Sequence, residues 1–346
     1  MHPELLELDP GELGPAAPIL SLSPGEAALL APDHPFLQHG EWRAFAAFHG
    51  GTLTARLVAS IDPRQASHGR AVGCIGFANV SDEEASAPSG TATEPVLAAA
   101  VGWLRERRVG VIRCPVQFST WYGHRAITGS FPDSGGAPAF LLEPRSDRSL
   151  VDLLLASDFA PAHRAVSYAV DPEIVIVSAR PALGRLYRAG LADRPLRASS
   201  LEEELRLLHR LSIDIFRGSW GFSEISIDEF GAMYRPLAHF ADPELVRVLE
   251  TADGHPIGFA FAMPDDAGLP GAGRFIVKSL GLLPEMRRRY PGAGAGLAAL
   301  IHLAARDRGY DGGIHALMAQ DSMAHRLSMR WGTQLRSYAT FARALQ

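Results

Sequence analysis

Residues 279–296 read SLGLLPEMRRRYPGAGAG and join a predicted strand, Arg274–Leu283, to a predicted helix, Ala295–Arg308. Glycines at positions 292, 294 and 296 let the backbone adopt positive φ and approach a ligand closely. The helix that follows presents unpaired N–H groups and a positive dipole end. Arg287, Arg288 and Arg289 add cationic donors beside it. The stretch therefore predicts a cradle for phosphate or pyrophosphate, although a structural glycine-rich loop with solvated arginines has the same pattern.

Two classes of nucleotide ligand compete for this loop. Gly294–Ala299 matches the dinucleotide fingerprint G-x-G-x-x-G/A, and Asp321 follows about 25 residues later. Eight residues separate Leu283 from Gly292, however, where that fingerprint needs a tight turn. A Walker A loop is excluded because no GK[ST] follows. The second class is coenzyme A, since residues 289–294 fit the pattern R-x-x-G-x-G.

The composition is that of an ordinary globular chain. At about 150 residues per domain, 346 residues suggest two domains. Apolar residues make up 47% and charged residues 21%, which makes disorder, collagen-like repeats and coiled coil poor explanations. The net charge of −5 gives no electrostatic reason to expect nucleic acid as a partner. Neither the composition nor the net charge indicates an oligomeric state.

The cysteines and the apolar runs indicate a compartment. Cys74 and Cys114 are too few for a disulfide framework and lack metal-ligand spacing, so no metal is expected and a reducing cytosol fits best. The first 42 residues contain no Lys or Arg, so we expect no signal peptide. No apolar run approaches the ~20 residues that span a bilayer. The sequence predicts a cytoplasmic protein without a membrane partner.

Residues 1–40 are predicted to be an extension that covers a first unit, residues 41–171. Gly50-Gly51 joins two apolar runs and is a hairpin signal. The remaining elements expected in this unit are the strands Arg70–Val80, Val111–Val116, Ala137–Leu142 and Ala165–Val170, and the helices Glu94–Arg107 and Ser149–Ser157.

Residues 172–192 are predicted to be a linking helix broken near Pro181, ahead of a second unit, residues 193–346. Ser200 with Glu203, and Ser226 with Glu229, read as capping boxes of two helices. A hairpin at residues 253–254 and a strand–helix–strand crossover through residues 274–320 follow. The element order repeats that of the first unit, which hints at an internal duplication. The fold class is α/β (α+β), with mixed, mostly antiparallel sheets flanked by helices.

The second unit resembles the GNAT N-acetyltransferase superfamily. Its R-x-x-G-x-G loop follows a Leu-Leu-Pro strand end, and Asp321, Ala324, Ser328 and Gly332 align with the N-x-x-A-x-x-x-Y-x-x-x-G pattern of that fold's last helix. Residues 217–222, RGSWGF, resemble the N-W-G-F segment of large tandem bacterial GNAT proteins. The first unit resembles the other half of those proteins in residues 70–77 and in residues 114–119, CPVQFS.

The resemblance implies tandem GNAT-like domains with one acyl-CoA site, because the first unit is degenerate. Its loop Ser81–Thr93 carries Asp82, Glu83 and Glu84 and no arginine, and carboxylates repel a pyrophosphate. The cofactor-binding residues expected in the second unit are Leu280, Leu282, Arg287, Arg288, Arg289, Gly292, Ala293, Gly294, Ala295, Gly296 and Asp321.

Acyl transfer from a thioester needs oxyanion donors, a route for the leaving thiolate and a neutral amine. The amides near Leu280–Leu282 are the candidate oxyanion donors. Ser328 stands where many members carry a proton-donating tyrosine, and a helix-surface serine is the alternative reading. His315, within a predicted strand, is the candidate base, with a water relay or a structural role as alternatives.

Three residues are candidates for substrate binding. Lys278, the single lysine of the chain, lies mid-strand and either pairs with an anionic group or extends its charge to the surface. Trp220 and Glu224 lie between the first two helices of the second unit, either beside the acceptor or as a hydrophobic plug and a solvated acid. The sequence thus predicts an acyl-CoA-dependent (acetyl-CoA) N-acyltransferase that acts on a small-molecule amine by direct transfer. Carrier-protein or hydroxyl acceptors, and a non-catalytic acyl-CoA-binding or scaffold role, are the alternatives.

Overall fold

The computed structural model describes residues 4–16, 18–80, 93–130, 136–144, 148–238, 242–265 and 273–345. The acidic loop on which the degeneracy of the first unit was predicted therefore lies, except for Thr93, outside the described residues.

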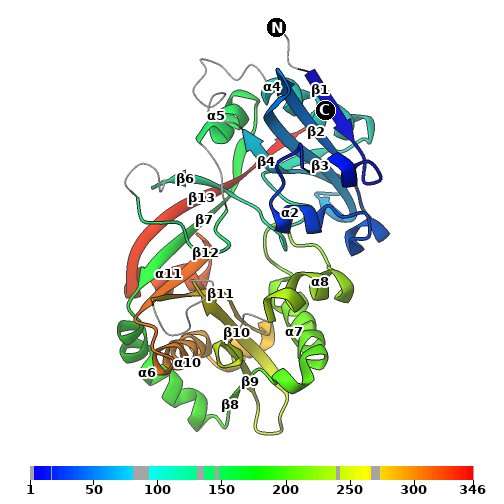
Figure 1. Cartoon of the computed structure of the whole chain (residues 1–346). Coiled ribbons are helices and arrows are strands. Elements are labelled where there is room, and N and C mark those ends of the chain that lie inside the picture. Colours follow the sequence, from blue (N-terminus) through cyan, green and yellow to red (C-terminus); the bar gives the residue numbers. More distant parts are fainter. Residues whose placement is uncertain are drawn as a thin grey trace.

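The strands of the chain join in one mixed sheet with the order β1-β2-β3-β4-β5-β13-β7-β12-β11-β10-β9-β8, and β6 pairs beside β13 (Figure 1). All pairings are antiparallel except β4–β5 and β11–β12, which are parallel. The strands are β1 (Glu4–Leu8), β2 (Glu41–His49), β3 (Thr52–Ser67), β4 (Arg70–Val80), β5 (Val111–Cys114), β6 (Ala126–Gly129), β7 (Ala160–Val170), β8 (Ala192–Pro195), β9 (Val246–Glu250), β10 (Pro256–Pro264), β11 (Arg274–Leu282), β12 (Gly312–Ala319) and β13 (Gly332–Ala344).

Helices cover this sheet in both units (Figure 1). The α-helices are α1 (Leu13–Ala16), α2 (Pro24–Leu29), α4 (Thr93–Glu106), α5 (Arg148–Ala156), α6 (Pro172–Arg188), α7 (Leu201–Phe216), α8 (Ile227–Ala238), α9 (Pro284–Arg289), α10 (Ala293–Asp307) and α11 (Met323–Trp331). Short 3₁₀ helices are η1 (Pro35–Gln38), η3 (Ala198–Ser200) and η4 (Pro243–Leu245). The predicted class, a mixed α/β fold with mostly antiparallel strands flanked by helices, is confirmed.

The two units exchange their last strands. β7, from the first unit, pairs with β12 of the second unit, and β13, the last strand of the second unit, pairs with β5 of the first. β7 and β13 also pair with each other along most of their lengths. The sheets expected for the two units are therefore one continuous sheet, and the predicted boundaries between units divide the sequence but not the hydrogen-bonded structure.

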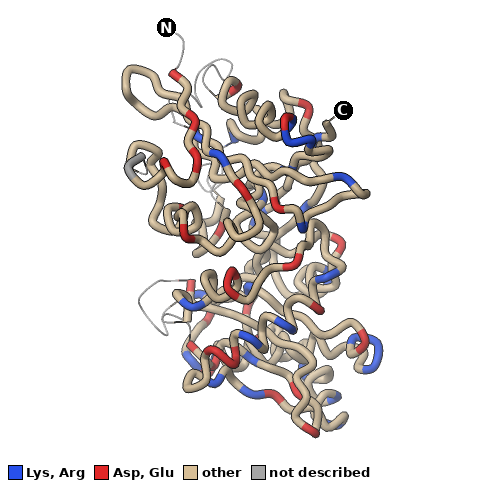
Figure 2. Tube along the Cα trace, turned by 90° about the vertical axis from the view of Figure 1, so that its right-hand side faces the viewer, with Lys and Arg blue, Asp and Glu red and all other residues tan. Residues whose placement is uncertain are grey.

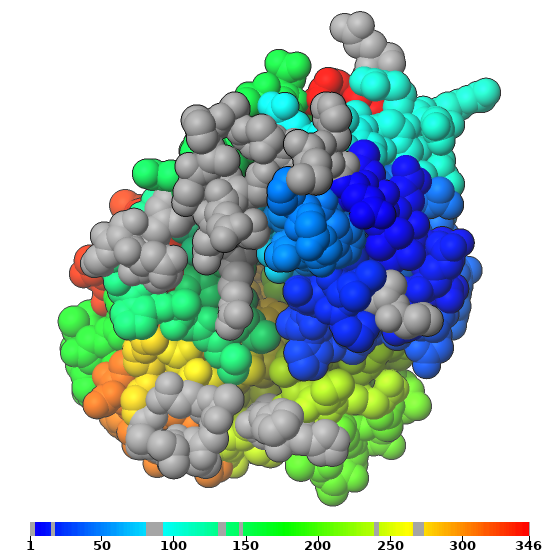
Figure 3. All heavy atoms as spheres, turned by 45° about the horizontal axis from the view of Figure 1, so that its top comes forward, coloured from blue at the N-terminus to red at the C-terminus, as the bar shows by residue number. Residues whose placement is uncertain are grey.

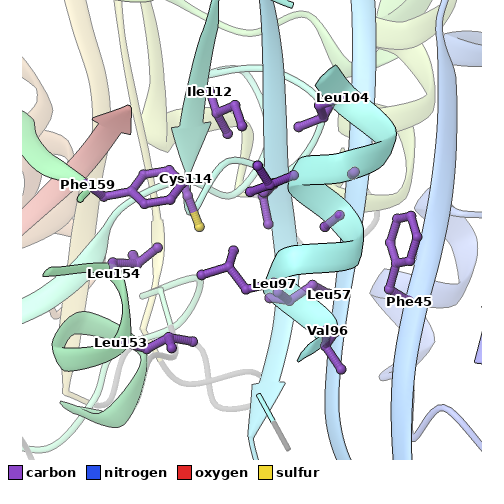
Figure 4. Close-up of a cluster of buried hydrophobic side chains, with 14 of the residues drawn as sticks. Phe45, Leu57, Val96, Leu97, Leu104, Ile112, Cys114, Leu153, Leu154 and Phe159 are labelled. Atoms are coloured by element: carbon purple, nitrogen blue, oxygen red, sulfur yellow. The ribbon is translucent and has the colours of Figure 1, made fainter. Parts of the chain in front are cut away.

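Two hydrophobic clusters nevertheless lie in different units, although the first also contains Ala339, Phe341 and Leu345 from the end of the chain. In the first unit, α4 and α5 cover β2–β5 with buried side chains that include Leu97, Leu104, Leu154 and Phe159 (Figure 4). In the second unit, α10 packs between α6 and the β9–β11 strands through a separate cluster. Burial of these apolar faces drives the layered arrangement. Among the described residues, no helix is long and apolar enough to cross a membrane.

Three local predictions were wrong. Helix α6 runs unbroken through Pro181, because its buried face packs on α10 and offsets the hydrogen bond that proline removes. Ser200 makes no side-chain cap, because η3 leads directly into α7. Residues 137–142 form no strand: Ala137 O accepts from the Arg336 side chain, and Leu141 N donates to Asp265.

The second capping box is confirmed. The Glu229 amide donates to Ser226 Oγ at 3.1 Å, and the Ser226 amide donates to the Glu229 carboxylate at 3.0 Å. Glu229 also joins the two units, because its carboxylate accepts from Arg64 on β3 at 2.9 Å. These bonds hold the N-terminus of α8 against the first unit, and Figure 3 shows this meeting of the blue N-terminal residues with the yellow-green residues of the second unit.

Candidate functional site

The parallel strands β11 and β12 separate partway along their length. They pair from Arg274↔Gly312 to Val277↔His315 and no further. Beyond this point β11 stays with β10, while β12 continues only along β7, with an irregularity between residues 315 and 318 where Leu317 has φ 56°. A wedge therefore opens between the two strands.

The open edge of β11 presents unpaired backbone groups. Leu283 N donates to Ile257 O at 2.9 Å. In an antiparallel pair the backbone N–H and C=O groups of every second residue point toward the partner strand, so those of residues 281 and 279 also point toward β10. The same alternation turns the amides of Leu280 and Leu282 toward the wedge. These are the two positions that the sequence had indicated as oxyanion or cofactor donors.

A cavity of about 2500 Å³ occupies this wedge and extends between the two units. It is lined by β11 and β12, by α10 and α11, by α7 and α8, and by residues 115–125 of the first unit. Of the sequence-predicted site residues, those on its wall are Trp220, Lys278, Leu280, Gly294, His315, Asp321 and Ser328.

The N-terminus of α10 opens at this cavity. Gly292 is its N-cap with φ 84°, a conformation that glycine adopts without strain, and no acidic residue lies in the first turn. Among the described residues, no acceptor bonds the amides of Gly292 and Gly294. Two free N–H groups at a positive helix end are the arrangement that binds anions.

The other predicted residues of this loop have structural contacts. A Cβ on Gly296 would lie 2.5 Å from Leu186 of α6, so this glycine allows close packing of α10 on α6. Ala293 is buried, and Ala295 packs partly buried beside Val175 and Trp331. Leu282 is buried in the core of the second unit. These residues position the helix end rather than line the cavity.

The three arginines of the loop differ. Arg287 donates from Nε to Leu282 O at 2.8 Å and from Nη2 to Ile215 O at 2.9 Å, so it ties β11 to the end of α7. Arg288 is exposed and Arg289 lies over the Tyr290 ring. Arg185 of α6, which sequence reasoning missed, reaches this helix end: its Nη2 lies 2.9 Å from the Cβ position of Gly292. Only the folded chain brings it there.

Ser328, His315 and His302 form a buried hydrogen-bonded chain. Ser328 Oγ lies 2.7 Å from His315 Nδ1, and His315 Nε2 lies 3.2 Å from His302 Nε2. His302 Nδ1 lies 2.7 Å from the carbonyl oxygen of Ala298. Ser328 is only 1% exposed, so the alternative reading of a helix-surface serine was wrong.

The partners fix the direction of each bond in this chain. Burial lowers the pKa of His302 to about 4, and burial followed by the neighbouring His302 lowers the pKa of His315 well below its usual value. Both rings are therefore neutral at pH 7. His302 Nδ1 must donate to Ala298 O, so its Nε2 accepts from His315 Nε2–H. His315 Nδ1 is left with a lone pair that can accept the Ser328 hydroxyl proton. The Ala324 carbonyl oxygen is a second acceptor of the same proton, at 2.9 Å against 2.7 Å for His315 Nδ1.

Trp220 and Glu224 have different surroundings. Trp220 is held between two side chains of the first unit: the His163 ring stacks on it at 4.9 Å, and Arg113 lies 4.7 Å from its centroid. Glu224 is 61% exposed and pairs with Arg217 at 2.9 Å, and it is not among the residues that line the cavity. Trp220 therefore lies on the cavity wall between the two units, and the Glu224 side chain lies on the outer surface.

Lys278 and Asp321 lie on opposite sides of the wedge. Lys278 Nζ donates to the Tyr234 hydroxyl of α8 at 3.4 Å and lies 5.4 Å from that ring. Asp321, just before α11, is exposed and its charge acts on His163 of β7. Among the described residues, no three His, Cys, Asp or Glu side chains gather in a way that could hold a metal ion.

Comparison with known proteins identifies the fold. The sequence matches no protein-family model and no curated protein. Solved structures are similar along 99% of the chain at low identity. An Enterococcus faecalis protein described as a probable N-acyltransferase has a TM-score of 0.60 at 11% identity, with 73% of its own chain covered. A tandem GNAT protein from the clavulanic acid biosynthesis pathway has a TM-score of 0.54 at 11% identity, with 98% covered.

A third solved structure is larger. The GCN5-related glucosamine N-acetyltransferase region of a fungal multi-domain β-N-acetylglucosaminidase has a TM-score of 0.57 at 13% identity, and this chain spans 38% of that protein's length. With these likenesses, the exchanged strands and the wedge between β11 and β12, the chain has the tandem GNAT fold. The resemblance drawn from the sequence is thereby confirmed at the level of fold.

Proposed function

We propose that this protein is an acyl-CoA-dependent N-acyltransferase, with acetyl-CoA as the simplest donor and a small-molecule amine as the acceptor. The observation that carries the proposal is the wedge between β11 and β12, which opens beside the two free amides at the start of α10. A GNAT fold without such an opening would have no place for the acyl donor.

The residues at the wedge fit an acyl-CoA. The amides of Gly292 and Gly294 would hold its pyrophosphate, with Arg185, Arg288 and Arg289 as the neighbouring cations. The amide of Leu280 would accept the charge that develops on the acyl carbonyl oxygen. When bound, the coenzyme supplies a thioester-activated acyl group. Arg287 and Gly296 contribute by holding this frame in place.

The Ser328–His315 pair is suited to move a proton. As Ser328 Oγ accepts a proton from the amine, its own proton passes to the lone pair of His315 Nδ1. Burial disfavours the imidazolium form, so the proton returns from His315 Nδ1 to Ser328 Oγ. Ser328 then gives a proton to the leaving sulfur, and the pair ends the cycle as it began it. His302 fixes the tautomer of His315 throughout.

Calorimetric titration with acetyl-CoA and, separately, with NAD tests the donor. We expect one acetyl-CoA per chain and no NAD. Mass spectrometry of products from a panel of small amines tests the reaction, with amide-linked acyl products expected. NAD binding without CoA binding would contradict the donor, and CoA binding without any acylated product would leave the binding-only role.

A further inference from the structure

Two cationic side chains of the cavity between the units, Arg125 of the first unit and Lys278 of β11, have no carboxylate partner among the described residues. His124 and His163 lie on the same wall, and burial lowers the pKa of both, that of His163 to about 4, so their rings are neutral at pH 7. These groups act on one another: Arg125, His163 and Lys278 each help to lower the pKa of His124, after the larger effect of burial. The carboxylate of Asp321 lies on the same wall but is exposed.

Arg125 is the most unusual of them. Its Nε is a buried donor without an acceptor, and no hydrogen bond or ion pair to its guanidinium occurs among the described residues. Burial lowers its pKa to about 10. Its backbone has φ 90°, a conformation that costs an L-residue energy and that clusters at ligand sites. Leaving a buried guanidinium unpaired is costly unless a ligand completes it.

Other arginines that line the cavity have partners, which sets Arg125 apart. Arg56 bonds Glu26 at 3.0 Å, and Arg274 bonds Asp265 at 2.5 Å. Lys278 resembles Arg125 in this respect, because within the described part of the chain its one hydrogen-bond partner is the uncharged Tyr234 hydroxyl. The unpaired charge is therefore concentrated where β11 of the second unit faces residues 124–125 of the first.

We propose that the acceptor amine carries an anionic group, a carboxylate or a phosphate, which binds between Arg125 of the first unit and Lys278 of the second. This inference rests on the proposed function for the amine, but the anion site itself stands on the unpaired cations of the cavity. The α10 terminus opens at the same cavity through Gly294, but its neighbouring cations Arg185, Arg288 and Arg289 do not line the cavity, so the two sites use different side chains.

The charge of the cavity also selects the reactive form of the acceptor. Positive groups repel an ammonium and favour its neutral, nucleophilic form. A purely cationic amine would therefore bind poorly, whereas an amine with its own anionic group would be held by that group. The first unit thus contributes to specificity although, among its described residues, the chain after β5 stays bonded to β4.

Matched pairs of probes test the anion requirement. β-Alanine is compared with β-alaninamide, and O-phosphoethanolamine with ethanolamine, by calorimetric titration of the full chain saturated with CoA. We expect one anionic member to bind at least about 10-fold more tightly than its uncharged partner. The pair that shows the preference distinguishes carboxylate from phosphate.

Variants assign the preference to the site. Arg125→Gln and Lys278→Met should each abolish it, whereas Arg210→Gln, which removes an exposed positive charge from α7, should keep it. Equal binding of both members of each pair, no binding of either anionic probe, or a preference that survives both cavity substitutions would overturn the proposal. Because the readout is binding, anion preference without acyl transfer would reject the proposed function and keep the anion site.

Discussion

The two strand–helix–strand crossovers of this chain share a plan and differ where it matters for binding. In the first unit β4, α4 and β5 form a parallel pair that ends at Cys74↔Arg113. The chain after β5 still follows β4, however: Val116 N donates to Ile75 O at 2.7 Å, and a Cβ on Gly76 would lie 2.4 Å from Val116 O. In the second unit β11 and β12 separate after their last pair.

Aromatic side chains fill the first unit beyond its strand pair. The ring centroids of Phe77 and Phe118 are 5.2 Å apart, and the Phe118 ring stacks on that of Phe36 of η1 with a centroid distance of 4.1 Å. In the second unit the corresponding space belongs to the cavity, which touches the end of β4 only from the side, at residues 77–80. The helix starts differ as well, because α4 begins with Glu94 in its first turn whereas α10 begins without an acid. The same topology can therefore leave the strand pair open or closed through packing alone.

Charge is distributed evenly outside these sites. Acidic and basic residues are interspersed along the described trace, as Figure 2 shows. The differences between the two crossovers are therefore local, and the following experiments test them in order of expected effect.

The largest effect is expected from Arg336→Met, which tests whether the exchanged strands make the units one cooperative body. Arg336 is fully buried on β13 and bonds Glu143 and the carbonyl oxygens of Ser130 and Ala137. Its loss leaves the Glu143 charge buried, which costs about 3–5 kcal/mol of unfolding free energy. Urea unfolding followed by two probes should show one shifted transition.

Two further variants control this result. Arg343→Met on the same strand, which has no ion pair among the described residues, should change stability little. Adding Glu143→Gln to Arg336→Met should restore part of the loss. Two separate transitions would show instead that the units unfold independently.

Gly294→Trp tests the difference between the helix starts. A Cβ on Gly294 lies 3.8 Å from Leu282 at its nearest contact, so a small side chain fits, whereas an indole would cover the free amides. We expect acetyl-CoA affinity to fall by about 100-fold or more, which is roughly 2.7 kcal/mol. Gly102→Trp in α4, where the Cβ position is open, should leave one CoA site per chain unchanged. Loss of CoA binding in Gly102→Trp would show that the effect of an added indole is not specific to the start of α10.

The buried histidines predict an acid-sensitive second unit. Burial lowers the pKa of His302 to about 4, whereas an unfolded histidine titrates near 6.5. Below about pH 6.5, His302 becomes protonated in the unfolded chain but stays neutral in the folded chain. Its contribution to stability is therefore present at pH 7 and falls by about 1.4 kcal/mol per pH unit toward pH 4.

Urea unfolding between pH 7 and pH 5 measures that slope. His302→Gln should reduce it by about one proton, and the exposed His49→Gln should not. An unchanged slope in His302→Gln would mean that His302 is not the neutral buried group described above.

Ser328→Ala should have the smallest effect. A thiol of pKa near 8.5 leaves without strong assistance, so we expect kcat to fall by about 10-fold while acetyl-CoA affinity is kept. Ser149→Ala in α5 of the first unit, which removes a buried hydroxyl without a partner, is the matched control and should keep kcat. Full activity in Ser328→Ala would limit the Ser328–His315 pair to a structural role.

Much of the fold followed from local patterns in the sequence. The bounds of β4, α7 and α11 agree with the periodicity of residues 70–80, 201–216 and 323–331. Such segments are predictable because each contains a complete apolar face at its own period, even where a predicted cap such as Ser200 is not formed. The glycine-rich loop before α10 was likewise recognised from the sequence alone, and its role in binding a ligand stays a prediction.

The strand exchange and the polar networks depended on residues far apart in the chain. The sequences of β7 and β13 do not show which sheet edge each strand joins. The alternation of apolar and polar residues specifies which face of a strand is buried, but not which strand pairs with it. His302, Ser328 and Arg125 meet their surroundings only when α10, α11 and residues 115–125 pack around β12. The sequence by itself determined most of the elements and the glycine-rich loop before α10, since these arise from local propensity. The tertiary structure alone decided which wedge stays open and which charges stay unpaired, because burial and pairing are set by the packing of distant segments.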